Sequence, residues 1–233
     1  NTAPYALLSH AFVGDVVVTP SLGARWNHND NYGAEIGWQT GLRIARETVA
    51  LHGHVAHAFN YAGTYAAIVF GGGGFDTLDA EQIDHVEVGF EWRASKTAKL
   101  NVAVYRDDVE NGIKVVVVPP AEYQNVGSYT SRGVEVSCEA RPSRALDLFA
   151  GLTFTDNAPA DLPYAPAYAA VAGLGWRFAQ RWKLGATLNA FDEQWSGNPR
   201  SPQPNVLVDA YTTLSLRLGC RITKFGSPFT GEF

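Results

Sequence analysis

Cysteine, methionine, long apolar runs and an excess of positive charge are scarce or missing in this chain. Its two cysteines, Cys138 and Cys220, lie far apart in strand-like runs, which argues against a disulfide framework and a clustered cysteine metal site. The formal net charge of −5 argues against a nucleic-acid partner, because proteins of that class carry a basic face. No stretch approaches the run of about 18 apolar residues that a membrane-spanning helix needs.

The two ends of the sequence also lack the usual signals. The chain has no methionine, and it does not start with the basic segment and short apolar run of a secretory signal. A strand pattern is already under way at the first residues, and another begins just before the last. We therefore expect a fragment, or a processed piece, of a longer protein.

Alternation of apolar and polar residues with a period of two runs through most of the chain. In the segment "RGVEVSCEA", Val134, Val136 and Cys138 fall on one side of an extended chain, and Glu135 and Glu139 fall on the other. Helical periodicity is almost absent. Such strands have one dry face and one wet face.

The alternation predicts an all-β, antiparallel up-and-down meander of about 11 to 12 strands. A region with four consecutive glycines, 71–74, interrupts the pattern and predicts a long irregular loop. The predicted strands cover 5–12, 16–28, 35–44, 48–58, 83–94, 100–105, the second half of 123–140, 145–155, 167–178, 182–191 and 206–222.

The connections between these strands alternate between short and long. Short ones lie around Gly14, Arg46, Lys96, Pro142 and Gln180, and long ones around residues 29, 72, 119, 156 and 199. Tight turns at one end and long loops at the other are typical of a transmembrane β-barrel of the outer-membrane type.

A membrane barrel needs apolar side chains toward lipid and aromatic residues near the strand ends. We expect acyl chains to contact the apolar row that includes Val88, Phe90, Val102, Leu148 and Leu188. Interfacial girdles are expected at Trp92, Trp176, Phe178 and Trp182.

A soluble sandwich or closed barrel with a packed interior would show the same alternation, because it also has one dry face. Two features favour the membrane barrel. The predicted strands approach 12 residues, against the usual five or six. The alternation of short and long connections persists through five cycles.

No arrangement of residues indicates catalysis, so we expect no enzyme activity and no cofactor. His52 and His54 project from one face of a strand, with His57 and His85 nearer loop ends, but no third ligand completes a metal site. The segment "RDDVEN", which contains Asp107 and Asp108, lacks the pattern of a calcium loop and is expected to be a solvated turn at a strand end. The segment "FGGGGFD" lacks the features of a phosphate loop.

Longer segments resemble one known family. The run "YQNVGSYTSRGVEVSCEARPSRALDLFAGLTFTDN" followed by "LPYAPAYAAVAGLGWRF" resembles the late barrel strands of TonB-dependent outer-membrane receptors, and "LDAEQIDHVEVGFEWR" is similar to another strand of that family. The similarity extends in order through nearly the whole chain. Together these motifs are specific, although each alone is weak.

The resemblance implies a barrel of about 22 strands with a plug domain inside it. Residues 1–233 would form a single partial barrel domain, the later half of that barrel without plug, energy-coupling segment or final strands. Such a piece should be an open, curved sheet with edges near 5–12 and 206–222, because a lipid-exposed sheet closes only when its edge groups are paired.

The implied function is energised uptake of a metal chelate of the siderophore, haem or cobalamin class in the bacterial outer membrane. The implied partners are outer-membrane lipid, the rest of the barrel and plug, a TonB-type energy-coupling protein that acts through the plug, and a bulky small-molecule ligand. The expected ligand contacts are Asn27, His28, Asn60, Tyr61 and Tyr65. A passive porin-type barrel and a soluble β-rich binding module are the alternatives.

Overall fold

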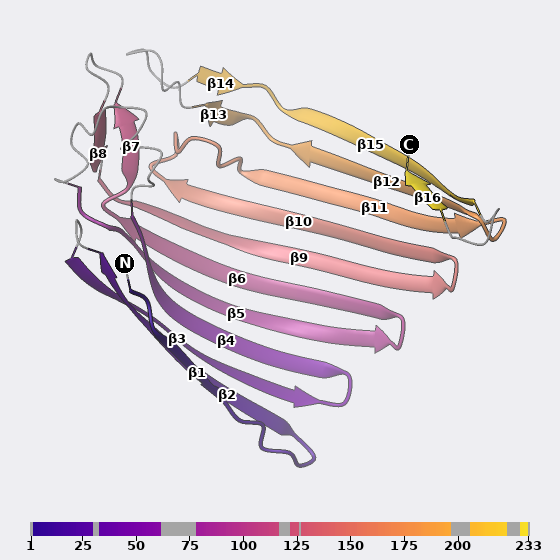
Figure 1. The fold of residues 1–233 in the computed structure, drawn as a ribbon, viewed down its shortest axis with the longest axis horizontal. Helices are drawn as coiled ribbons and strands as arrows, with labels where there is room; N and C mark the ends of the chain where they lie inside the picture. The colour runs from indigo at the N-terminus through magenta and orange to yellow at the C-terminus, as the bar shows by residue number, and fades with distance from the viewer. Residues whose placement is uncertain are drawn as a thin grey trace.

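The computed structural model describes residues 2–29, 33–61, 78–116, 122–125, 127–196, 206–222 and 229–232. These residues form an all-β, antiparallel fold, in which strands of alternating residues pair with their neighbours along the chain (Figure 1). In this part of the chain no helix is long and apolar enough to cross a membrane.

One sheet of twelve strands contains most of the molecule. Its order follows the sequence, β1-β2-β3-β4-β5-β6-β9-β10-β11-β12-β15-β16, as an up-and-down meander requires. The strands are β1 (Tyr5–Ser9), β2 (Val17–Asn29), β3 (Gly33–Arg46), β4 (Val49–Asn60), β5 (Glu81–Ser95), β6 (Ala98–Glu110), β9 (Tyr129–Ser143), β10 (Leu146–Ala158), β11 (Tyr168–Phe178), β12 (Trp182–Phe191), β15 (Tyr211–Ile222) and β16 (Phe229–Glu232).

The two ends of the sheet differ in their connections. Tight turns join β3 to β4, β5 to β6, β9 to β10 and β11 to β12 at one end, on the right in Figure 1. The long connections lie at the opposite end, where two small hairpins pair β7 (Ile113–Val116) with β8 (Glu122–Asn125) and β13 (Gln194–Ser196) with β14 (Val206–Val208). We call these the turn end and the loop end.

The sheet is curved and open, with β1 and β16 as its outermost strands, so it is a partial barrel (Figure 1). The predicted first edge is confirmed. The predicted second edge, at 206–222, is wrong by one strand, because β16 adds to β15 through pairs such as Cys220 with Gly231. The stretch 206–222 is also not one strand: it divides into β14 and β15 around Asp209 and Ala210.

The convex face of the sheet carries the apolar residues, and no second layer of described residues covers it. The exposed fractions of Val88, Leu148 and Leu188 are 56%, 37% and 45%, and Phe90 and Val102 pair with each other on the same face. Among the described residues only four apolar ones are buried, namely Ala50, Leu78, Ala80 and Val109. A soluble sandwich or closed barrel of this size would bury far more apolar side chains, so the described residues do not form the packed interior that this alternative requires.

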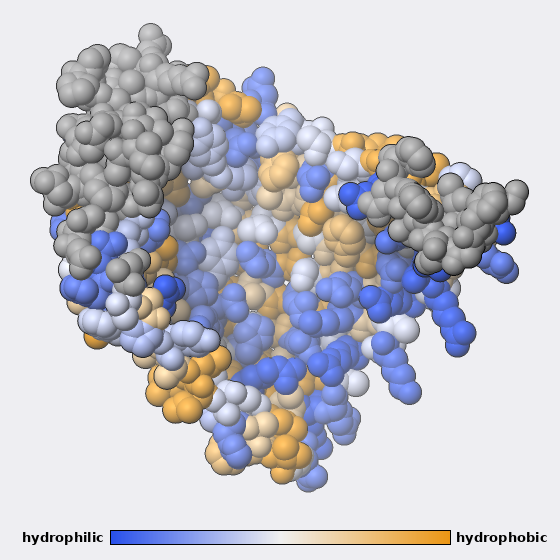
Figure 2. Space-filling model, in the orientation of Figure 1, coloured by the Kyte–Doolittle hydropathy of each residue, from blue (hydrophilic) through white to orange (hydrophobic). Residues whose placement is uncertain are grey.

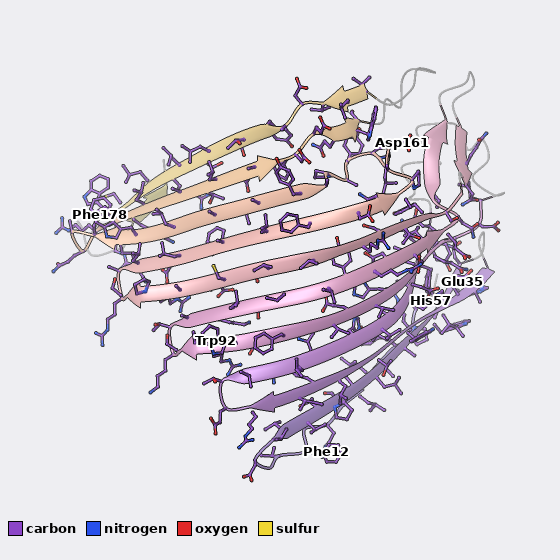
Figure 3. The ribbon with its side chains drawn as sticks, turned by 180° about the vertical axis from the view of Figure 1, so that it is seen from behind. Phe12, Glu35, His57, Trp92, Asp161 and Phe178 are labelled. Atoms are coloured by element: carbon purple, nitrogen blue, oxygen red, sulfur yellow. The ribbon has the colours of Figure 1, made fainter. Side chains whose placement is uncertain are left out.

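The predicted aromatic residues lie on the convex face at the turn end. Trp92, Trp176 and Trp182 are all exposed. The Phe178 ring lies between the other two aromatics of its hairpin, 4.7 Å from the Trp176 ring and 6.5 Å from the Trp182 ring. Figure 3 labels Trp92 and Phe178 at this end, with Glu35 and His57 at the loop end.

Candidate ligand-facing surface

The concave face is formed by the alternate residues of the same strands and is mainly polar. In Figure 2, blue and white residues with scattered orange ones cover the hollowed middle of the visible face. Because successive residues of a strand point to opposite faces, each strand contributes its apolar residues to the convex surface and its polar residues to the concave surface. Any ligand or partner inside a closed barrel would meet this concave face.

Histidines and carboxylates pair across strands β4, β5 and β6 on the concave face. His52 Nε2 lies 3.2 Å from Glu87 Oε1, and His85 Nδ1 lies 2.6 Å from Asp107 Oδ1. The His54 ring lies 5.7 Å from the His85 ring. The prediction that His52 and His54 face the wet side together is confirmed. Across the described ranges, no three His, Cys, Asp or Glu side chains are grouped to hold a metal ion.

Asp107 and Asp108 correct one sequence prediction. They belong to β6 and not to a turn, and they point to opposite faces. Asp107 contacts His85 on the concave side, whereas Asp108 accepts hydrogen bonds on the convex side from Arg106 and Thr130. The sequence "RDDVE" lacks the Gly or Pro that marks a turn, and this absence was the signal that the strand continues.

Glycines allow large side chains to lie flat against the concave wall. A methyl group on Gly89 would clash with the His52 ring, and one on Gly173 would clash with the Phe149 ring. Tyr105 crosses Gly133 in the same way, so that its hydroxyl reaches Thr155 Oγ1 at 3.2 Å. The wall therefore stays smooth, although it carries aromatic residues.

Cations are concentrated on the concave face toward the turn end. Glu91 alone receives three of them: Arg43 at 3.2 Å, Arg93 at 3.1 Å and Lys99 at 3.4 Å. A hollow of about 1070 Å³ occupies this region. Its charged lining consists of Arg93, Lys96, Lys99, Arg141, Lys183 and Arg217, with Glu139 and Asp147. The hollow would thus attract anionic groups.

A second polar group lies at the loop end, where β2, β3 and β4 approach their long connections. Asn27 has an exposed fraction of only 5% and pairs in register with Glu35. Burial raises the pKa of the Tyr61 phenol, the nearby Asn27 amide opposes this rise, and the charge of Glu35 adds to it. Tyr61 is therefore a neutral hydroxyl at physiological pH, able to donate a hydrogen bond.

The structure brings some of the predicted ligand contacts together and separates others. Asn27 and Tyr61 are neighbours, and Asn60, opposite Glu81, is the last residue of β4 and directly precedes Tyr61. His28 follows the convex row, where its ring stacks 5.8 Å from that of Trp26. Tyr65 lies outside the described residues. Sequence patterns did not single out Glu35, whose role depends on strand register.

A sequence model of one protein family matches nearly the whole chain. Its description is "TonB dependent receptor-like, beta-barrel", and the match covers residues 4–227. A search of curated protein sequences found no match.

Solved structures of receptors and a transporter for iron or iron chelates have a similar fold. A mutant of the ferric enterobactin receptor PfeA from Pseudomonas aeruginosa, in complex with enterobactin, gives a TM-score of 0.70 at 18% identity, over 95% of this chain and 38% of that one. The ferric-catecholate import receptor Fiu from E. coli K12 gives 0.67 at 14%, over 95% and 38%. The FrpB iron transporter from Neisseria meningitidis gives 0.66 at 15%, over 94% and 38%. The chain thus spans about two fifths of the length of these proteins.

Proposed function

Because this chain belongs to the TonB-dependent receptor family through its β-barrel domain, we propose that it forms part of the wall of a bacterial outer-membrane receptor that imports a metal chelate. The supporting observation is a sheet of twelve strands with a polar concave face and an apolar convex face that no second layer of described residues covers. Apolar side chains in those positions are stable in lipid, whereas in water they would favour aggregation.

The proposed cargo is an iron chelate of the siderophore type, within the broader class that also includes haem and cobalamin. The structurally similar receptors are described as ferric enterobactin, ferric-catecholate and iron transporters, and this supports the choice of metal. Uptake of a bulky chelate against a gradient needs an energy source. We propose that a TonB-type protein supplies it, acting through a plug domain that occupies the barrel formed together with other strands.

The proposed chelate contacts lie at the loop end of the concave face. Asn27 and Tyr61 form a partly buried pair next to Glu35, and Asn60 ends β4 directly before Tyr61. An amide and a neutral phenol can donate hydrogen bonds to the oxygen atoms of a chelate, and the phenol ring can also stack on it. Tyr65 remains a predicted contact.

Uptake in cells tests the proposed function. A strain that lacks the receptor containing this chain is compared with the complemented strain for accumulation of ferric enterobactin labelled with radioactive iron. We expect accumulation only in the complemented strain, and only while the proton gradient across the inner membrane is intact. Accumulation that persists after the gradient is collapsed would indicate a passive porin-type barrel and contradict the proposal.

Substitutions at the loop end test the site. Tyr61→Phe and Asn27→Ala each remove hydrogen-bonding groups, so the dissociation constant of a bound chelate should rise about three- to tenfold, as expected for one or two hydrogen bonds. His28→Ala is the matched control, since His28 lies on the convex face. Titration of the purified receptor with ferric enterobactin, followed by tryptophan fluorescence, measures these values. Equal affinities for Tyr61→Phe, Asn27→Ala and the unsubstituted receptor would remove both residues from the site.

A further inference from the structure

A compact group of charged side chains interrupts the apolar convex face near the loop end, across strands β4, β5, β6, β9 and β10. We call it the convex polar patch. It occupies two adjacent rows of the sheet, in which register pairs His57 with Asp84, Asp84 with Asp108, Arg106 with Arg132 and Arg132 with Asp156. Thr130 lies beside Asp108 and completes the patch.

The patch begins immediately where the apolar rows end. Val88, Val104, Val134 and Phe154 form the last row that is apolar across these strands, and Arg106 and Arg132 lie in the next one. Adjacent rows on one face are two residues apart, or about 7 Å along a strand. If the apolar rows contact acyl chains, as the proposed function requires, the patch lies at the depth of the lipid headgroups.

Carboxylates hold the two arginine side chains of the patch in fixed orientations. Arg106 donates from Nε and Nη2 to the two Asp108 oxygens, at 2.8 and 2.9 Å. Arg132 donates from Nε and Nη2 to Asp156 Oδ2, at 2.9 and 2.6 Å. In both cases the Nη1 edge of the guanidinium is not used by these bonds. The side chains remain 59% and 66% exposed.

The placement of these two cations requires an explanation. Arg106 and Arg132 are directly opposite each other on neighbouring strands, an arrangement in which like charges destabilise a sheet. The carboxylates are already bonded, Asp84 to His57 at 2.7 Å and Asp108 and Asp156 to the arginines. An anion between the two guanidinium groups would relieve their repulsion and use their remaining N–H groups.

We propose that the convex polar patch binds the phosphate group of a lipid headgroup in the leaflet at the loop end, through Arg106 and Arg132. A guanidinium presents two parallel N–H groups that match the geometry of phosphate oxygens. At the edge of the hydrocarbon region the attraction between a guanidinium and a phosphate is stronger than in bulk water, because the surrounding dielectric constant is lower. The proposal rests on the proposed membrane location of the chain.

Lipid binding by the complete receptor tests this proposal. The receptor is purified in detergent, stripped of lipid and titrated with micelles that contain diphosphoryl lipid A, and retained lipid is counted by native mass spectrometry. We expect the Arg106→Gln/Arg132→Gln receptor to bind at least about tenfold more weakly, as for the loss of charge-assisted hydrogen bonds. Arg93→Gln/Arg141→Gln makes the same change of charge on the concave face and should bind as the unsubstituted receptor does.

Two further arms separate the possible outcomes. Dephosphorylated lipid A should bind the unsubstituted receptor about as weakly as diphosphoryl lipid A binds the Arg106→Gln/Arg132→Gln receptor. The Arg106→Lys/Arg132→Lys receptor keeps the charge without the planar fork and should give an intermediate value, even if the glutamine variant does not fold. Equal binding of phosphorylated and dephosphorylated lipid, or equal binding by lysine and arginine receptors, would overturn the phosphate site. Ferric enterobactin uptake would be unaffected by that result, so failure here is distinct from failure of the proposed function.

Discussion

Single residues on the concave face determine how much space remains along the wall. Gly133 is the clearest case, because a methyl group there would clash with the Phe154 carbonyl oxygen and lie 2.7 Å from the Tyr105 hydroxyl oxygen. The backbone oxygen cannot move without breaking the pairing of β9 with β10. Only glycine therefore fits at position 133 beside the Tyr105 ring and the Phe154 carbonyl group.

The substitution Gly133→Ala should destabilise the barrel by about 2 kcal/mol, as is typical of overpacking at a tight site. The Gly53→Ala variant is the control, because the nearest atom to its new methyl group is the Glu87 carbonyl oxygen at 3.8 Å, an ordinary contact. Urea unfolding of receptor refolded into lipid vesicles, followed by tryptophan fluorescence, measures both. Equal midpoints for the two variants would show that Tyr105 and β10 adjust freely.

At this scale the sequence predicted which face a side chain occupies but not what it contacts. Alternation correctly placed His52 and His54 on one face, which is the concave one. The pairing of His85 with Asp107 needs the register of two strands separated by a turn, and the contact of Asn27 with Tyr61 needs three strands. The register between strands depends on pairing across the whole sheet, and the sequence of a single strand does not determine it.

Among the elements, the hairpin of β7 and β8 is held to the main sheet by side-chain hydrogen bonds, most of them made by Asn125. The Ile113 N–H also donates to Glu81 Oε2 at 3.1 Å. Asn125 Nδ2 donates to the Asp79 and Asn111 carbonyl oxygens at 3.0 and 2.7 Å, and its Oδ1 accepts from the Asp79 N–H at 2.8 Å. These bonds connect the hairpin to the residues just before β5. No strand pairing joins the hairpin to the twelve-stranded sheet, since β7 and β8 form a separate two-stranded sheet among the described residues.

The substitution Asn125→Ala should weaken the attachment of this hairpin to the sheet. Loss of three hydrogen bonds, two of them to backbone groups of Asp79, should raise the hydrogen-exchange rates of residues 113–116 and 122–125 about tenfold or more, with the twelve-stranded sheet unchanged. Asn189→Ala removes one amide on an exposed bond to Thr213 in the main sheet and serves as control. Unchanged exchange in the hairpin of Asn125→Ala would contradict the role assigned to Asn125.

Element boundaries were predictable where turn residues punctuate the pattern. The strand at 182–191 has the predicted bounds, and the ends of β2, β3, β4 and β5 differ from the predicted ones by one or two residues. The break between β14 and β15 was missed because Asp209 and Ala210 carry no strong turn signal. β7, β8 and β13 were also missed, since strands of three or four residues show too little alternation to recognise.

At the scale of the whole molecule, contact with lipid on the convex face and with water on the concave face explains how apolar and polar residues are distributed over the sheet. The chain has almost no buried core among its described residues, yet its strands are long, regular and paired in sequence order. Stability must then come from backbone pairing, cross-strand contacts and the surroundings of the convex face. The outermost strands β1 and β16 would be paired in a closed barrel, as in the longer receptors of similar fold.

Accessibility of single spin labels tests the central claim, that the convex face contacts lipid while the concave face does not. Labels are attached to cysteines introduced in a Cys138→Ser/Cys220→Ser background, at Val104, Leu152 and Leu188 on the convex face and at their neighbours Ala103, Thr153 and Asn189 on the concave face. In receptor reconstituted into vesicles, we expect the first set to be relaxed mainly by oxygen dissolved in the bilayer and the second set to be less accessible to it. Equal oxygen accessibility in each neighbouring pair would contradict the account.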